Sequence, residues 1–425
     1  MLHLKNNDLW ILYYIFLGII QAMWTNLSAF PPLPLRLLMN VAVFVPMFTR
    51  KDCAVFGIPF FMILRGQLGT AYQYLPDIYS YYTYISLLLF LLIIHYKKYF
   101  LANLKSYLPL LSIIIYMWII DILGISECGK YVVHLFIAFL YLLLINSKED
   151  SRNLFVALVS VCTLLAVYYL IMYNQFLDTW DVKEGIERSG WNDPNYFSTF
   201  LGIGLLLATF QLLGYVHNDF VLFRPIILIA AIGIIFLAIV LTASRAGFIA
   251  ASLILLFAII KSRPKLSTVL LAFLIIVVSI FVMYKNGVFD TLLYRLVEQG
   301  NMDTGGERTT IWANVIQNYD DQNFLTQLFG GGYWHRVQLS DGHEVHNEFI
   351  AFWADYGYIG FILFAVMILS MLSKNNQTYK IRNLSVLYYI LMIISLSPFQ
   401  FINVGFFIAW IISLKLPSMS GVSEE

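Results

Sequence analysis

The sequence has few charged residues and few cysteines, and both scarcities restrict the kind of protein it can encode. Only 12% of its 425 residues are Asp, Glu, Lys or Arg, about half of the roughly 25% that is usual in soluble domains. The formal net charge of +1 at pH 7 gives no basic field that would attract nucleic acid. Cys53, Cys128 and Cys162 stand far apart, which indicates neither a zinc cluster nor a disulfide framework. We expect these three cysteines to be packing residues.

Long apolar stretches take the place of charge. Hydrophobic residues make up 60% of the chain, and the mean hydropathy is +0.76. This composition excludes a single soluble core and predicts an all-α polytopic membrane protein. The first apolar run follows one basic residue, Lys5, and no convincing small-residue cleavage site comes after it. We therefore expect an uncleaved first membrane segment and not a signal peptide.

Short polar stretches divide the apolar sequence into about 12–14 predicted membrane segments. The segments are 9–29, 35–48, 53–64, 78–96, 107–125, 130–146, 154–177, 195–215, 221–242, 245–260, 266–284, 347–372, 384–397 and 401–414. Several are shorter than the roughly 20 residues that a straight helix needs to cross the hydrocarbon. Pro46 and Pro59 favour broken helices over 35–64, and the sequence SPFQF favours the same over 384–414.

The positions of Lys and Arg predict the orientation of these segments. With the N-terminus in the cytoplasm, the loops on that side hold Arg50, Lys51, Lys97, Lys98, Lys105, Lys148, Arg152, Lys261, Arg263, Lys265, Lys374, Lys380 and Arg382. This is the positive-inside pattern. The same topology places the polar loops 178–194 and 285–346 on the external side. In a chain of short connections, a loop of about 60 residues is a candidate functional region.

These loops predict the domain organisation. An N-terminal bundle over 1–284 contains the loop 178–194, the long external loop follows over 285–346, and membrane segments with a cytoplasmic tail complete the chain over 347–425. No internal repeat or low-complexity tract is present.

The long loop contains one clear helical pattern. In ERTTIWANVIQNY (307–319), the residues Ile311, Trp312, Val315 and Ile316 recur at helical spacing. The pattern predicts an amphipathic helix on the outer membrane–water boundary.

Three arginines lie at predicted external positions. Arg245 stands between two apolar runs, where it is either a snorkelling or capping residue or a fixed cation for a phosphate. Ala246 and Gly247 after it allow a ligand or another helix to come close. Arg308 opens the predicted amphipathic helix, where free N–H groups and the helix dipole favour an anion; the alternative is a surface ion pair. Arg188 is the third arginine at an external position, and the alternative is that it is an ordinary loop charge.

The sequence HEVHNE crowds ionisable groups against the start of an apolar segment. It contains His343, Glu344, His346, Asn347 and Glu348. Histidine is the side chain best suited to accepting a proton near neutral pH, so the cluster predicts a general base. A metal site and a solvated loop cluster are the alternatives. The spacing H-x-x-H differs from the H-E-x-x-H of zinc hydrolases, which disfavours metal.

Glycines mark two further places near this cluster. LFGGGYW (328–334) must contain a turn, and Gly330–Gly332 form either a flexible turn or a backbone nest for an anion. Gly357 and Gly360 lie inside the segment after the histidines, where they predict close helix packing.

The order of these motifs resembles a known family. TASRAG stands at a segment boundary, GERTTIW lies in the long external loop, and HEVHNEFIAFWADYGYIGF opens the next segment. Together they resemble the O-antigen ligase and polymerase superfamily, the Wzy and WaaL proteins. The resemblance covers roughly residues 180–375, and the N-terminal half is similar only in being a series of membrane segments.

The resemblance implies a GT-C-type membrane glycosyltransferase at the periplasmic face of the bacterial inner membrane, with an undecaprenyl-diphosphate-linked glycan as donor. It implies that Arg245 and Arg308, joined by Arg188, hold the diphosphate and that His346 assists deprotonation of the acceptor hydroxyl. The expected supporting residues are Asn347, Glu348, His343, Asp193 and Asn195. The resemblance implies no metal and no other cofactor. The expected partners are the lipid-linked oligosaccharide, membrane lipids and a Wzz-type chain-length regulator, and not nucleic acid.

Three function classes follow. RSGWNDPNYFS (188–198) is more similar to a polymerase than to a ligase, which would transfer finished glycan to lipid A-core or a protein acceptor. A flippase or transporter would require inverted repeats and charges near mid-membrane. Here the ionisable groups gather at one face, apart from residues such as Asp121 and His134. We expect those two to be packing or internal hydrogen-bonding residues, or part of an acceptor path.

Overall fold

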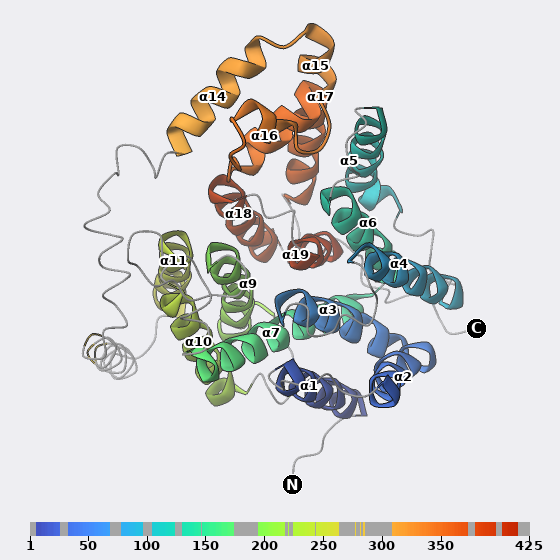
Figure 1. The fold of residues 1–425 in the computed structure, drawn as a ribbon. Helices are drawn as coiled ribbons and strands as arrows, with labels where there is room; N and C mark the ends of the chain where they lie inside the picture. Colours follow the sequence, from blue (N-terminus) through green and yellow to red (C-terminus); the bar gives the residue numbers. More distant parts are fainter. Residues whose placement is uncertain are drawn as a thin grey trace. The chain divides into compact units, whose positions relative to one another are not determined.

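Helices are the regular secondary structure of the described residues. The computed structural model describes residues 6–25, 33–68, 78–96, 104–123, 130–145, 147–173, 194–216, 220, 224–242, 244–262, 277, 281, 284, 308–372, 379–396 and 402–414. Within these ranges no residue forms a strand, which confirms the all-α prediction. The helices are α1 (Asn6–Thr25), α2 (Leu33–Thr49), α3 (Lys51–Leu68), α4 (Ile78–His95), α5 (Leu104–Leu123), α6 (Lys130–Leu142), α7 (Lys148–Ile171), α9 (Pro194–Leu212), α10 (Pro225–Leu241), α11 (Arg245–Ser262), α14 (Arg308–Asp320), α15 (Phe324–Phe329), α16 (His335–Leu339), α17 (Glu348–Met371), α18 (Tyr379–Ser395) and α19 (Ile402–Ser413) (Figure 1).

The predicted membrane segments correspond closely to these helices. Each segment that falls within the described ranges overlaps one of them, and the segment 266–284 lies mostly outside those ranges. Pro46 lies inside α2 and Pro59 inside α3. The break expected over 35–64 therefore occurs at Arg50, between the two helices, and not at either proline.

Three of the described helices are long and apolar enough to cross a membrane. They are Lys148–Ile171, Asn195–Leu212 and Glu348–Met371, and other apolar helices are shorter. A helix in lipid bonds all its backbone groups within itself, which is why apolar runs of this length fold as helices there. The count of about 12–14 spans remains a prediction.

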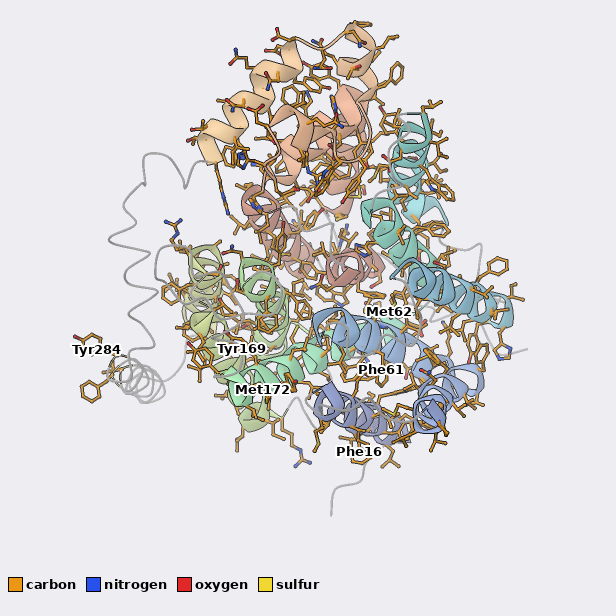
Figure 2. The ribbon with its side chains drawn as sticks, in the orientation of Figure 1. Phe16, Phe61, Met62, Tyr169, Met172 and Tyr284 are labelled. Atoms are coloured by element: carbon orange, nitrogen blue, oxygen red, sulfur yellow. The ribbon has the colours of Figure 1, made fainter. Side chains whose placement is uncertain are left out.

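One compact unit combines Met1–Asp8 with Leu158–Asp303, which is the middle of the chain. In it, α9 packs against α10 and α11. Gly204 of α9 lies so close to Cys162 of α7 that an added Cβ would stand 2.3 Å from the Cys162 Cβ. Tyr169, labelled in Figure 2, is buried with its ring centroid 5.1 Å from that of Phe197.

The other compact unit combines Leu9–Ala157 with Thr304–Glu425. In it, α19 packs against α6 and α3, while α17 packs against α5, α15, α16 and α18. Figure 2 labels Phe61 and Met62, which are buried on α3, and Phe16, which is 59% exposed on α1. The predicted domains are consecutive in sequence, whereas this unit joins two distant stretches. Residues 308–347 consequently share a unit with α5 and α17, and these elements build the site described next.

Candidate functional site

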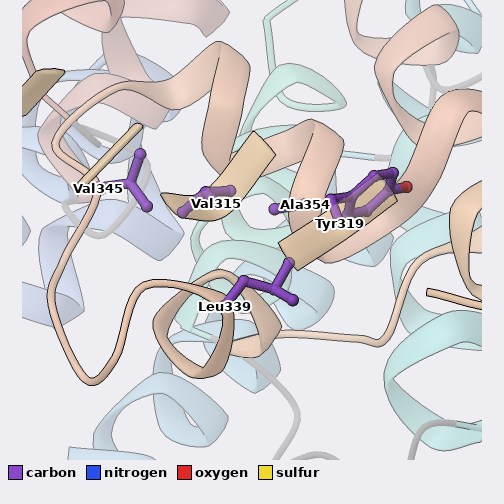
Figure 3. Close-up of a cluster of buried hydrophobic side chains, with 5 residues drawn as sticks. All are labelled: Val315, Tyr319, Leu339, Val345 and Ala354. Carbon is purple, nitrogen blue, oxygen red and sulfur yellow. The ribbon is translucent and has the colours of Figure 1, made fainter. Parts of the chain in front are cut away.

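Residues 308–347 fold into a layer with an apolar core of its own against α17. This loop core consists of Val315, Tyr319, Leu339, Val345 and Ala354 (Figure 3). The first two come from α14, the next two from α16 and the chain after it, and Ala354 from α17. Burial of such side chains stabilises the layer by roughly 1.5–3 kcal/mol for each large one. Residues 308–347 are therefore a folded platform and not a linker.

The helix predicted over 307–319 is present as α14, and most of its apolar stripe packs within the folded layer. Val315 is buried in the loop core, and Ile311 and Trp312 pack against that core. Of the four residues that define the stripe, only Ile316 is exposed. The position of this helix at the membrane–water boundary stays a prediction.

A hydrogen bond from α14 holds the chain directly before His346. The indole Nε1 of Trp312 donates to the carbonyl oxygen of Val345 over 2.8 Å. Residues four apart are neighbours on a helix surface, so Arg308, at the first position of α14, lies beside Trp312. Arg308 is thus four residues from one partner of this hydrogen bond, and His346 is the residue after the other partner.

His346 occupies a backbone conformation that few side chains adopt. Its φ is +50°, in the left-handed region where His is enriched among non-glycine residues. The turn at His346 presents Asn347 as the N-cap of α17, where its Oδ1 accepts from the Ile350 N–H over 3.1 Å. Glu348, in the first turn of α17, is fully buried. His343 is exposed, so the two histidines of the motif have different surroundings.

A buried ion cluster, consisting of Arg336, Glu344 and Asp355, joins the platform to α17. Arg336 is fully buried. Its Nε donates to Glu344 Oε1 over 2.9 Å and its Nη2 to Glu344 Oε2 over 3.3 Å. Its Nη1 donates to Asp355 Oδ2, and its backbone N–H donates to Asp355 Oδ1 over 2.8 Å. Two carboxylates thus enclose one guanidinium in the bidentate manner that arginine favours.

Aromatic rings cover the guanidinium of the ion cluster. Its Cζ lies 5.3 Å from the ring centroid of Tyr333 and 5.0 Å from that of Trp334, within the range of cation–π attraction. Burial raises the pKa of the Tyr333 phenol to about 12, although the Arg336 charge acts in the opposite direction. Tyr333 therefore stays neutral. Arg336 is fully engaged with these groups, which makes it a structural residue and not a ligand for phosphate.

The platform is also bonded to α5. Asp121 Oδ1 accepts from the Tyr333 backbone N–H over 2.8 Å, and its Oδ2 lies 3.5 Å from the Tyr356 hydroxyl. The Tyr116 hydroxyl lies 3.0 Å from the carbonyl oxygens of both Phe329 and Tyr356. Asp121 is therefore an internal hydrogen-bonding residue, one of the alternatives expected from the sequence. His134 is buried where α6 meets α19.

The glycine turn fits against a kink in α17. Gly357 has φ +67° inside that helix, and a Cβ added there would stand 2.6 Å from the Gly330 nitrogen. The Gly330 N–H donates to Thr326 and the Gly332 N–H to Asp355, both to carbonyl oxygens. The predicted anion nest is wrong at these two positions, since their N–H groups already have backbone partners. The simpler interpretation as a turn is confirmed.

Arg245 lies in the compact unit Leu158–Asp303, at the first position of α11 and half-buried. The Ser244 hydroxyl before it donates to Asn195 Oδ1 over 3.0 Å and accepts from the Gly247 N–H over 3.2 Å. A Cβ on Gly247 would stand 2.3 Å from Ser198 Oγ, which confirms that this glycine permits close approach of another helix. Asn195 thus ties the start of α9 to the helix start that carries Arg245.

Two predicted site residues, Arg188 and Asp193, lie outside the described residues. Within the described ranges, no three His, Cys, Asp or Glu side chains form a group that could hold a metal ion. Independence from metal stays a prediction.

Sequence reasoning overlooked Arg336 and Asp355. A carboxylate inside a strongly apolar segment is costly unless it is paired, and this signal could have identified Asp355. Its partner could not be found in the same way, because Arg336 stands in a polar loop beside many other polar residues.

Part of the chain is similar to a known family. A family model described as O-Antigen ligase matches residues 230–365, a segment that contains Arg245, Arg308 and His346. The matched segment is 136 of the 425 residues, so the chain is similar to this family over about a third of its length. Comparisons with curated proteins and with solved structures gave no match.

Proposed function

We propose that the protein is a surface polysaccharide polymerase of the O-antigen type. It transfers a glycan from undecaprenyl diphosphate to the non-reducing end of a lipid-linked repeat unit, at the periplasmic face of the bacterial inner membrane. The observation that carries this proposal is the Trp312–Val345 hydrogen bond, which joins the helix that begins at Arg308 to the residue before His346. A base and a fixed cation near one point are what an attack on a glycosyl diphosphate requires.

His346 has the role of general base. The acceptor hydroxyl gives its proton to the imidazole while its oxygen forms a new bond to the anomeric carbon. The bond between that carbon and the diphosphate oxygen breaks, and undecaprenyl diphosphate leaves with the electron pair. Attack from the face opposite the leaving group inverts the anomeric configuration. A general base of this kind contributes roughly 10²–10⁴-fold to a rate.

The arginines Arg245, Arg308 and Arg188 are assigned to the diphosphate. The leaving group gains negative charge as the sugar bond breaks, so a fixed guanidinium stabilises the transition state more than the ground state. Arg308 and Arg245 each stand at the first position of a helix, where the helix dipole adds to their attraction for an anion. The ion cluster does not bind substrate, since it is occupied within the protein.

The supporting residues have different roles. Asn347 caps α17 and so fixes the turn at His346, and Asn195 fixes the helix start that carries Arg245. Glu348 places a carboxylate in the first turn of α17, where the helix dipole favours it. His343, which is exposed, and Asp193 are assigned only secondary contacts with the glycan.

A ligase is the second candidate, because the matching family model is described as O-Antigen ligase. Such an enzyme would use the same base and the same arginines but another acceptor, lipid A-core or a protein.

One reconstitution distinguishes the two candidates. Purified protein in bilayers receives lipid-linked single repeat units and no other acceptor. A polymerase produces a ladder of longer lipid-linked glycans from these units alone. A ligase produces nothing until lipid A-core is added, and this result would overturn the proposal.

A further inference from the structure

The short helix α15 exposes large apolar side chains although it belongs to a polar loop. Phe324 is 73% exposed and Leu325 is 65% exposed, and Phe329 at the other end is also exposed. Covering that much apolar surface is worth several kcal/mol in sum, so its exposure to water would be unfavourable.

The apolar surface of α17 gives the depth at which α15 lies. Tyr358, Ile362, Val366 and Leu369 are all exposed, and their spacing places them on one face of the helix. We assign this face to lipid. From Tyr358 to Met371 the helix rises roughly 21 Å, and after Leu372 the sequence SKNNQ is polar.

The hydrocarbon core of a bilayer is about 30 Å thick. If the hydrocarbon core begins at the polar sequence after α17, it continues past the kink at Gly357. That kink is the level of α15, because the Leu328 carbonyl and the Gly330 nitrogen stand within 2.6 Å of a Cβ added at Gly357. The six residues of α15 extend only about 9 Å from there.

The helix α5 gives an independent indication of the same depth. Its Tyr116 hydroxyl contacts the Phe329 carbonyl oxygen at the end of α15. Beyond Tyr116 the helix continues to expose Trp118, Ile119 and Ile122, over about 9 Å. An apolar environment therefore extends on both sides of the α15 level.

Three of the last four carbonyls of α15 have the hydrogen bonds that a lipid environment demands. The last four carbonyls of a helix normally need water or a cap, and an unsatisfied group is costly in hydrocarbon. Here the Thr326, Gln327 and Phe329 carbonyls accept from Gly330 N–H, Tyr319 Oη and Tyr116 Oη respectively. At the N-terminal end, Asn323 Oδ1 accepts from the Thr326 N–H.

We propose that α15 is inserted into the membrane and that Phe324 and Leu325 contact the acyl chains of the leaflet on the side of residues 308–347. The depth of α15 in the bilayer, the exposure of Phe324 and Leu325, and the hydrogen bonds of the α15 carbonyls all favour lipid over a protein partner. The inserted helix holds the platform, and with it the loop that carries His346, against the bilayer. This inference does not depend on which glycan is transferred.

Spin labels measure the depth directly. The native cysteines Cys53, Cys128 and Cys162 are replaced by Ala, and the cysteine-free protein is accepted only if its unfolding temperature is unchanged. Nitroxides are then attached to Leu325→Cys or, as a second variant, Phe324→Cys in phosphatidylcholine/phosphatidylglycerol nanodiscs. Ile362→Cys on α17 is the lipid control, and Gln317→Cys on the exposed side of α14 is the water control.

The expected result is that the labels at 324 and 325 collide with oxygen more than with a water-soluble nickel chelate, as at 362. Preference for the nickel chelate, as at 317, would overturn the proposal. So would an immobile label that neither reagent reaches, because a protein partner or a second copy would then cover α15.

Discussion

The helices α11 and α17 both begin at the edge of an apolar segment, but their first turns are stabilised in different ways. At α11, the hydroxyl of Ser244 and the side chain of Asn195 supply the bonds, and half-buried Arg245 follows at once. At α17, Asn347 caps the helix, but a whole layer of protein with its own core and a buried ion cluster covers this start. A local cap suffices to begin a helix. In the proposed function, the folded cover at α17 also holds His346 in one position.

The largest expected effect concerns His346. His346→Asn should reduce glycan polymerisation by about 10²–10⁴-fold because the base is lost, while the protein stays folded, since Asn tolerates a positive φ. Chain length on gels and the unfolding temperature in detergent measure the two properties. The control is Gln317→Ala on the exposed side of α14, which should remain active. Normal chain lengths in His346→Asn would remove the base from the mechanism.

The ion cluster should give the largest loss of stability. Arg336→Ala leaves Asp355 and Glu344 without their cation, and breaking a buried pair costs about 3–5 kcal/mol. Thermal unfolding and proteolysis of residues 308–347 would report the loss. The control is Arg224→Ala, at an exposed arginine before α10, which should change little.

A double variant tests whether the charges of the cluster serve stability alone. Arg336→Met with Asp355→Leu should recover much of the stability, because apolar groups of similar volume often replace a buried pair at little cost. Failure of this recovery would mean that the cluster sets the path of the platform chain as well as its stability.

Substitutions at two glycines distinguish the cost of backbone strain from the cost of a close contact. Gly342 has φ +91° with no atom within 4 Å of an added Cβ, whereas Gly357 has φ +67° and meets backbone atoms at 2.6 Å. Gly342→Ala should cost only the strain, about 1–2 kcal/mol. Gly357→Ala should cost more, measured as free energy of unfolding, because the glycine turn must move. Equal losses would show that the turn does not press on the kink as described.

Substitution at the start of α11 should lower stability less than substitution in the ion cluster. Ser244→Ala removes the cap of α11 and should lower stability by about 0.5–2 kcal/mol, with a moderate loss of activity as Arg245 is displaced. Thr310→Ala, at an exposed position in the first turn of α14, is the control in the same assays. A loss as large as that of Arg336→Ala would remove the contrast between the two starts.

Removal of metal ions by a chelator should leave the activity unchanged. We expect full activity in EDTA, because the proposed chemistry uses arginines where a metal would otherwise bind the diphosphate. Glycan synthesis is measured before and after chelation, with zinc or magnesium returned separately. Loss of activity that one ion restores would revive the metal interpretation of HEVHNE.

Much of the fold was accessible from patterns along the chain. Apolar runs predicted the helices because burial in lipid depends on composition and length, both of which are local. The start of α14 at Arg308 and the boundary at Arg245 were predicted from the same local signals. The choice of His346 as the general base comes from the resemblance to a known family, and it stays a prediction.

Contacts between distant residues could not be read in this way. Arg336 pairs with Glu344 eight residues away and with Asp355 nineteen residues away, and nothing in either spacing is periodic. The apolar stripe of α14 shows the same limit, since a stripe fits lipid and protein equally well. Only the folded chain decides which surface covers it.

The sequence by itself determined that the protein is an all-helical membrane protein, where its apolar helices lie, and which histidine and arginines are candidates for chemistry. Tertiary structure alone decided that residues 308–347 form a platform with its own core, that Arg336 belongs to the fold, and that the turn at His346 lies beside the contact between Trp312 and Val345. The physical reason is that hydropathy acts residue by residue, whereas a buried charge or a close backbone contact is stable only when its partner arrives from elsewhere in the chain.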